Sequence, residues 1–144
     1  MPRRQSGWTE NGMRRARALW TPQSQARLRR DTERTLARLG RFGVKVARAV
    51  APVRTGQLRE NIVATSEREG RTSQVTVGLS AATREEAIAA YVAEFGRGHG
   101  PRGEFARGPL AGRGFLRTSR ILVRRRARGA IQRVMRAHAR RELT

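Results

Sequence analysis

The stretch from residue 51 to residue 62 most constrains what this chain can fold into, because it must end one element and begin another. Pro52 has no amide hydrogen to donate and disfavours helical geometry at the residue before it. Gly56 tolerates a positive φ, and the side-chain oxygen of Thr55 can accept from nearby backbone amides. Leu58 and the isoleucine that ends the stretch are four residues apart, so they can share one buried face. We therefore predict a structural turn between a helix and a strand, built on Pro52, Thr55, Gly56 and Leu58.

Apolar periodicity predicts the elements on either side of this turn. A helix is expected over residues 22–50, since Thr21 fits an N-cap and a proline follows at the first helical position. Two stretches rich in β-branched residues, 61–67 and 73–79, predict an antiparallel hairpin whose turn contains Gly70. Two glycines inside the helix indicate a bend or close packing there: Gly40 and Gly43.

The rest of the chain predicts two more helices and a loop. A short helix is expected after the hairpin, because Thr83 and Glu86 have capping-box spacing. Residues 91–95 are interpreted as a further strand, and residues 96–114 as a long loop rich in glycine and arginine. A last helix is expected over about residues 116–143. The predicted class is α+β, with long N- and C-terminal helices packed on a small antiparallel sheet.

The domain organisation is predicted as an N-terminal arm, residues 1–20, and a single α+β domain, residues 21–144. The arm alone buries too little apolar surface to fold stably, so it is either flexible or ordered against a neighbour. Tryptophans exposed on a free tail would be costly, which favours docking on another molecule. Trp8 and Trp20 are therefore candidate inter-subunit residues.

The net charge limits the partners of this chain. Its 144 residues include 32 Lys and Arg against 11 Asp and Glu, a formal charge of +21. Such a surface repels copies of itself unless something neutralises it, and nucleic-acid phosphates and an acidic protein are the two candidates. No cysteine is present, which excludes a disulfide scaffold and thiolate chemistry. No apolar run is long enough to cross a bilayer and no signal peptide is apparent, so we expect no membrane partner.

A search for catalytic or metal-binding clusters predicts none, and no cofactor. His99 and His138 are isolated, with no carboxylate at ligand spacing. Glu85 and Glu86 are adjacent, so on a helix they point in different directions and fit first-turn acids better than a general acid/base pair. No P-loop sequence occurs. We expect a protein that is not an enzyme.

Arginines in the glycine-rich loop and on the last helix are the candidate interaction residues. Arginine offers planar donors to phosphate, and glycine allows the backbone to approach closely. The alternative is a flexible connector whose arginines are simply solvated, and the sequence leaves both open. The candidate DNA- or partner-facing residues are Arg97, Arg102, Arg107, Arg113, Arg117, Arg124 and Arg128.

Three segments, in order, carry a family resemblance: residues 51–59 (APVRTGQLR), residues 91–96 (YVAEFG) and residues 114–119 (GFLRTS). Together with the intervening hairpin they resemble the tail-completion, or neck, family of long-tailed bacteriophages, typified by the gene-ten product of HK-type lambdoid phages. Its members similarly carry an Ala-Pro-x-x-Thr-Gly-x-Leu turn and a Pro-Phe-Leu entry to the last helix. This chain departs from that pattern at Arg54, commonly aspartate, at Gly114, commonly proline, and in its longer, more basic loop.

The resemblance implies a structural virion protein, assembled in the cytoplasm of the bacterial host and located at the neck or top of the tail. It implies a homo-oligomeric ring, with six copies expected from tail symmetry, that contacts neighbouring neck and tail proteins. Double-stranded genomic DNA passing through such a ring would meet an arginine-rich surface without sequence readout.

Charge alone supports a rival interpretation. A basic nucleic-acid-binding protein of histone-like or ribosomal type would also carry +21, and it would bind without forming a ring. The scarcity of lysine and of stacking aromatics, and the ordered motifs, favour the neck interpretation. A toxin or nuclease would need a catalytic cluster, which the sequence does not offer.

Overall fold

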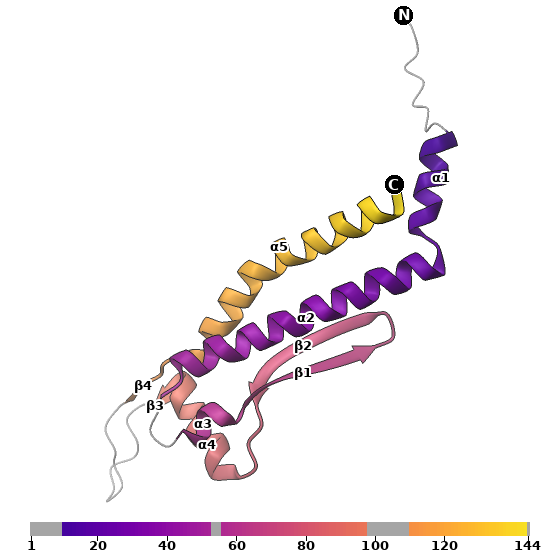
Figure 1. The fold of residues 1–144 in the computed structure, drawn as a ribbon. Coiled ribbons are helices and arrows are strands. Elements are labelled where there is room, and N and C mark those ends of the chain that lie inside the picture. The colour runs from indigo at the N-terminus through magenta and orange to yellow at the C-terminus, as the bar shows by residue number, and fades with distance from the viewer. Residues whose placement is uncertain (1–9, 53–55, 98–109, 144) are drawn as a thin grey trace, which may run out of the picture. The chain divides into compact units, whose positions relative to one another are not determined.

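The computed structural model describes residues 10–52, 56–97 and 110–143. Its two compact units are residues 1–35 with 129–144, and residues 36–128. The predicted α+β class is confirmed: two long helices accompany a small antiparallel hairpin (Figure 1). The elements are α1 (Glu10–Leu19), α2 (Pro22–Val50), α3 (Gln57–Glu60), β1 (Ile62–Glu69), β2 (Thr72–Leu79), α4 (Arg84–Phe95), β3 (Gly96–Arg97), β4 (Leu110–Ala111) and α5 (Phe115–Leu143).

Helix α2 has the predicted bounds, Pro22–Val50. The Thr21 hydroxyl accepts from the backbone N–H of Ser24 at 3.2 Å and thereby caps the first turn. At the other end the guanidinium of Arg59 donates twice to the carbonyl of Ala51, at 3.1 and 2.9 Å. This arginine satisfies a helix-end carbonyl that would otherwise lack a partner, so the residues after the turn hold the end of the helix in place.

The turn after α2 confirms the prediction for the part that the structure describes. Pro52 lies just beyond the helix, and Gly56 has φ 75°, the left-handed conformation that favours glycine. Thr55 lies outside the described residues. Helix α3 follows directly, and it was not predicted. Leu58 and Ile62 pack in the same apolar cluster, with Ile62 fully buried.

The hairpin is longer than the predicted strands, because β1 and β2 pair from Ile62↔Leu79 through to Glu69↔Thr72. Gly70 in the turn has φ 55°. The inner face of the hairpin lies against α2 at the two glycines (Figure 1): a Cβ at Gly40 would lie 2.6 Å from Val75 Cγ1, and one at Gly43 would lie 2.8 Å from Val77 Cγ2. The interior glycines therefore allow close packing, one of the two predicted alternatives.

The core of the larger unit is small and lies where α2, the hairpin and the start of α5 meet. Its fully or almost fully buried members are Ala47, Ala51, Ile62 and Phe115. Helix α5 is bound to α2 by a buried hydrogen bond from the Ser119 hydroxyl to the Gly43 carbonyl, at 2.8 Å. The Arg126 guanidinium also lies 4.0 Å from the centre of the Phe42 ring, a cation–π contact.

Two predictions need correction. The strand expected at residues 91–95 is wrong, because these residues form the second half of α4, with Ala90 and Glu94 buried on one face. The alanine-rich sequence favours the helix, and Gly96, at φ 82°, ends it. The expected loop over residues 96–114 contains a short antiparallel pair, β3 with β4, at its base. Residues 98–109 of that loop lie outside the described part.

The predicted arm contains a helix. Residues 10–19 form α1, and the chain turns immediately afterwards through a hydrogen bond from the Trp20 N–H to the Arg17 carbonyl, at 3.0 Å. This helix was not predicted, because a segment this short was expected to bury too little apolar surface to fold by itself. The boundary between arm and domain remains a prediction.

Candidate protein and nucleic-acid interface

A single buried carboxylate fixes the start of α5. Glu94, 7% exposed on α4, accepts from the backbone N–H of Leu116 at 2.8 Å and from that of Arg117 at 2.9 Å. It therefore acts as an N-terminal cap supplied from another helix, and its charge complements the helix dipole. The sequence contains both segments but does not reveal their pairing, because they are about twenty residues apart.

The backbone around this cap is equally constrained. The N–H of Arg113 donates to the carbonyl of Ala93 at 2.8 Å, and the N–H of Gly114 donates to that of Glu94 at 3.0 Å. Gly112 lies so close to the backbone of residues 94–96 that a Cβ would collide with it. These contacts hold the end of α4 and the start of α5 together.

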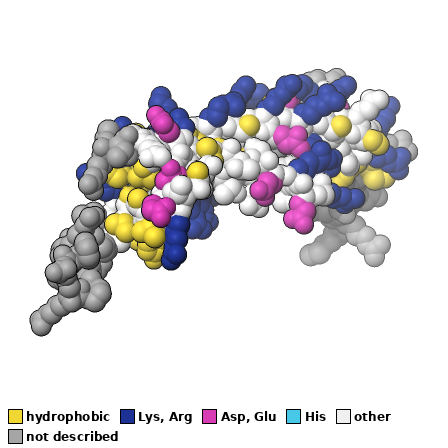
Figure 2. Space-filling view, turned by 90° about the horizontal axis from the view of Figure 1, so that it is seen from below, with side chains coloured by type: hydrophobic (Ala, Val, Ile, Leu, Met, Phe, Trp, Pro, Cys, Tyr) yellow, Lys and Arg dark blue, Asp and Glu magenta, His cyan; other side chains and the backbone are white. Residues whose placement is uncertain are grey.

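The first half of α5 exposes a dense group of arginines. The helix carries ten arginines and a single acid, Glu142. Among the described residues no carboxylate pairs with the arginines between Arg117 and Arg128. This surface can therefore attract phosphate or carboxylate groups from another molecule. Figure 2 shows basic side chains prevailing over acidic ones on one face of the molecule.

Some of these arginines border a groove beside the hairpin. The groove has a volume of about 1330 Å³ and lies between β2, the end of α4 and the first turns of α5. Its β2 wall is formed by four consecutive residues, 74–77. Four arginines line it: Arg113, Arg117, Arg120 and Arg124.

The predicted site residues fall into three groups. The structure brings Arg113, Arg117 and Arg124 together at the groove, while Arg128 lies on α5 outside it. The backbone of Arg97 lies in β3, and Arg102 and Arg107 lie outside the described residues. Of the two tryptophans, Trp20 is 74% exposed and Trp8 is not described.

An exposed apolar stripe on α4 was not predicted as a site. Ile88, Tyr91 and Phe95 are 54%, 63% and 70% exposed, and the two rings lie 4.8 Å apart. Figure 2 shows exposed hydrophobic side chains gathered in a patch on the face in view. Aromatic side chains exposed in this way are typical of protein–protein contacts. The spacing of residues 88, 91 and 95 is the helical spacing that could have predicted this stripe. It was overlooked because residues 91–95 were interpreted as a strand.

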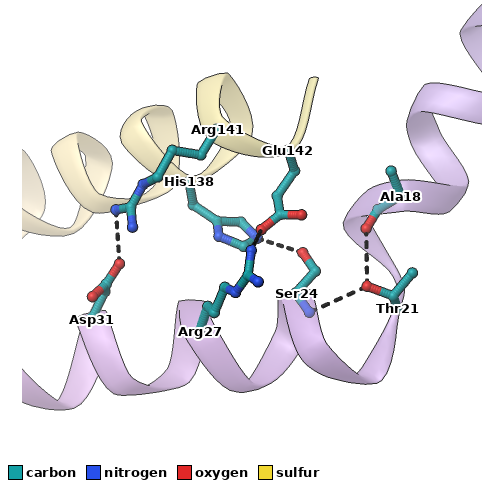
Figure 3. Close-up of polar contacts among 8 residues, drawn as sticks. All are labelled: Ala18, Thr21, Ser24, Arg27, Asp31, His138, Arg141 and Glu142. Carbon is teal, nitrogen blue, oxygen red and sulfur yellow. Dashed lines mark hydrogen bonds and ion pairs between the residues drawn. The ribbon is translucent and has the colours of Figure 1, made fainter. Parts of the chain in front are cut away.

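The histidine on α5 is part of the structure of the smaller unit. His138 and Ser24 are both buried, and His138 Nε2 lies 2.9 Å from the Ser24 hydroxyl (Figure 3). Two ion pairs flank this contact, Arg27–Glu142 at 3.3 Å and Arg141–Asp31 at 2.9 Å. These polar contacts join the beginning of α2 to the end of α5, so both histidine and serine are used in packing.

The described residues offer no metal centre and no membrane span. Within residues 10–52, 56–97 and 110–143, no three His, Cys, Asp or Glu side chains are grouped as metal ligands. No helix in this part of the chain is long and apolar enough to cross a membrane.

Glu86 serves a structural role: its carboxylate accepts from Asn61 Nδ2 at 3.2 Å and from the Ala82 N–H at 2.9 Å.

Comparison with known proteins identifies the family. Residues 23–96, just over half of the chain, match the family described as "Bacteriophage HK97-gp10, putative tail-component". The match covers almost all of α2, the hairpin and α4, and it ends at the glycine that terminates α4. No curated protein and no solved structure matches the chain. The chain belongs to the HK97-gp10-like family of bacteriophage tail components.

Proposed function

We propose that this protein completes the tail and joins it to the DNA-filled head, as a ring of six copies around the DNA channel. Its family places it among tail components, so it acts beside other tail proteins in a virion. The observation that supports the finer proposal is the arginine surface of α5, where the guanidinium groups between residues 117 and 128 form no ion pair with a carboxylate of the described chain. A ring around DNA would supply phosphates to these side chains without any sequence readout.

Removal of the protein from its virus tests the neck role. In the phage or phage-like particle that encodes the chain, deletion of its gene should give DNA-filled heads and separate tails, visible by negative-stain electron microscopy. Supplying the protein to an extract of such particles should restore joined particles. If intact, joined particles form without the protein, the proposal is wrong. A histone-like or ribosomal protein would instead leave joining unaffected and change DNA packaging or translation.

The ring itself depends on two complementary faces on each copy, because head-to-tail contacts join different surfaces of one protomer. Trp20, 74% exposed, and Trp8 are the proposed contacts of the N-terminal arm. Removing residues 1–20 should therefore lower incorporation into particles while the larger unit stays folded. Mass measurement of the assembled neck should give six copies of the full chain. Normal incorporation of the truncated protein would exclude a contact through the arm.

Binding to duplex DNA tests whether the arginine surface faces the DNA channel. Affinity should fall steeply with salt and should be equal for unrelated sequences, because released counterions dominate it. Replacing Arg125 and Arg128 with glutamine should lower the salt slope by up to about 0.9 for each phosphate that the variant no longer neutralises. Replacing the loop arginines Arg97, Arg102 and Arg107 should act in the same way. An unchanged slope with impaired docking to tails would show that these arginines meet acidic protein instead.

A further inference from the structure

The groove beside β2 borders the edge of a strand and not one face of the sheet. Successive side chains of a strand point to opposite faces, and yet four consecutive residues, Gln74 to Val77, line the groove. Within the described residues β2 pairs with β1 alone, so its outer edge has no strand partner. An unpaired edge presents a row of backbone N–H and C=O groups that can bind another extended chain.

The hairpin register identifies which of these groups face the groove. Ser80 donates its N–H to the carbonyl of Asn61 at 2.8 Å, so these two residues form a hydrogen-bonded pair of the antiparallel ladder. Hydrogen-bonded and non-hydrogen-bonded pairs alternate along the ladder. The register Ala64↔Val77 and Ser66↔Val75 therefore makes both valines members of non-hydrogen-bonded pairs. Their N–H and C=O groups point away from β1, toward the groove.

The opposite wall is suited to an acidic segment with some apolar side chains. Four guanidinium groups line the groove and form no ion pair with a carboxylate among the described residues: those of Arg113, Arg117, Arg120 and Arg124. Glu94 also lines the groove, but its carboxylate already accepts from the backbone N–H groups of Leu116 and Arg117. Between them Ile121 is 45% exposed and also lines the groove. The volume of about 1330 Å³ exceeds the roughly 300–1,000 Å³ that is usual for a small-molecule pocket. A stretch of polypeptide fits these properties better than a small ligand.

The chain's own remaining segments have the wrong charge for this groove. Residues 1–9 contain two arginines and no acid, and residues 98–109 contain two arginines and one acid. We infer that the groove binds an extended, acidic segment of a neighbouring protein, which adds as a third strand to the free edge of β2 through Val75 and Val77. The inference that the groove binds an acidic strand does not depend on the proposed function. Only the origin of that segment, a tail or neck neighbour, rests on the proposed function.

A pair of designed peptides tests this inference on the full-length protein. The probe is a short fluorescein-labelled peptide in which valine alternates with glutamate. Its control has the same charge but carries proline at the central valine, which removes a backbone donor and opposes strand pairing. Fluorescence anisotropy should show binding of the probe at least about tenfold tighter than that of the control, a difference of about 1.4 kcal/mol. Hydrogen exchange should slow at the amides of Val75 and Val77 when the probe binds. Equal affinity for both peptides would mean charge attraction alone and would overturn the inference.

Two arginine pairs on the same helix provide a matched comparison. Arg120→Glu with Arg124→Glu reverses charge inside the groove and should weaken probe binding by about tenfold or more. Arg125→Glu with Arg128→Glu makes the same charge change outside the groove and should have a much smaller effect. Circular dichroism should show that both double variants are folded. Equal weakening by both pairs would reject the groove as the binding site.

The same experiments separate this inference from the neck role. If the peptides fail these criteria while particle joining requires the protein, the strand-addition inference is wrong and the neck function stands. If the probe binds as described but joining does not require the protein, only the neck function is wrong. Sedimentation tests a further alternative: if the probe dissociates an oligomer of the chain, the natural occupant is a second copy, and the inference of a different protein is overturned.

Discussion

Replacing Glu94 with alanine should destabilise the protein by about 3 kcal/mol, because the carboxylate holds the start of α5. It is 7% exposed and accepts two backbone hydrogen bonds, from Leu116 and Arg117, at 2.8 and 2.9 Å. A hydrogen bond to a charged group contributes about 1.5–3 kcal/mol, and a buried donor left without a partner costs about 1–3 kcal/mol. Amides of a first helical turn can rebind water when the cap is removed, so the lower end of the range applies to each bond.

Urea unfolding followed by far-UV circular dichroism measures this effect. Tryptophan fluorescence would be a poor probe, since the only tryptophans are at positions 8 and 20, outside the unit that contains Glu94. A loss of about 3 kcal/mol corresponds to a fall in melting temperature of roughly 6–12 °C for a chain of this size. Particles should also incorporate less of the variant, because the loop and the arginine surface are anchored at this point.

Two control variants separate the charge and hydrogen bonds of Glu94 from general effects on α4. Glu94→Gln keeps the volume and one acceptor oxygen, so it should lose roughly half as much free energy of unfolding as the alanine variant. Glu85→Ala removes an exposed acid from the same helix and should change stability by less than about 0.5 kcal/mol. If Glu94→Ala were no more destabilising than Glu85→Ala, the carboxylate would not stabilise the start of α5, and the prediction would be refuted.

Three further predictions can be measured by the same urea titration. Gly43→Ala should destabilise by about 1–3 kcal/mol, because its Cβ would lie 2.8 Å from Val77 and 3.0 Å from Val123, whereas Gly129→Ala, in more open space on α5, should stabilise by up to about 1 kcal/mol. Gly56→Val, at φ 75°, should cost more than about 1 kcal/mol, while Gly78→Val, on a strand with nothing within 4 Å, should be nearly neutral. Ser24→Ala should cost about 1–3 kcal/mol, because it leaves the buried ring of His138 without its hydroxyl partner. Equal effects of the two substitutions in either glycine pair, or a neutral Ser24→Ala, would contradict the packing described.

Local sequence signals predicted the elements whose ends are set by nearby residues. Thr21 with the following proline indicated the start of α2, and the Thr83 hydroxyl accepts from the Glu86 N–H at 3.2 Å, as the capping-box spacing predicted. The hairpin followed from β-branched residues and Gly70. In each case the decisive contact joins residues a few positions apart, which a sequence pattern records directly.

The errors and omissions depend on contacts between distant segments. Residues 91–95 contain β-forming side chains, but they continue an alanine-rich helix, in which Glu94 contacts the start of α5 and Ala93 packs on the core. The groove requires β2 and α5 to lie on either side of it, and its wall residues are about forty positions apart. No periodicity in the sequence records such pairs. Three of the four groove arginines, Arg113, Arg117 and Arg124, were candidates from the sequence, which could not show that they would lie together. The fourth, Arg120, was not among the candidates.

The arginines on the first half of α5 fall into two sets by position. Arg117, Arg120 and Arg124 line the groove, whereas Arg125 and Arg128 do not. If the first set binds an acidic segment and the second set meets DNA, reversal of charge should separate the two activities. Arg120→Glu with Arg124→Glu should weaken probe binding by about tenfold or more and retain most of the salt slope for duplex DNA. Arg125→Glu with Arg128→Glu should lower that slope and have a much smaller effect on probe binding. If each pair instead reduced probe binding and DNA binding equally, the arginines of the helix would form a single basic surface. The acidic partner and DNA would then compete for that surface.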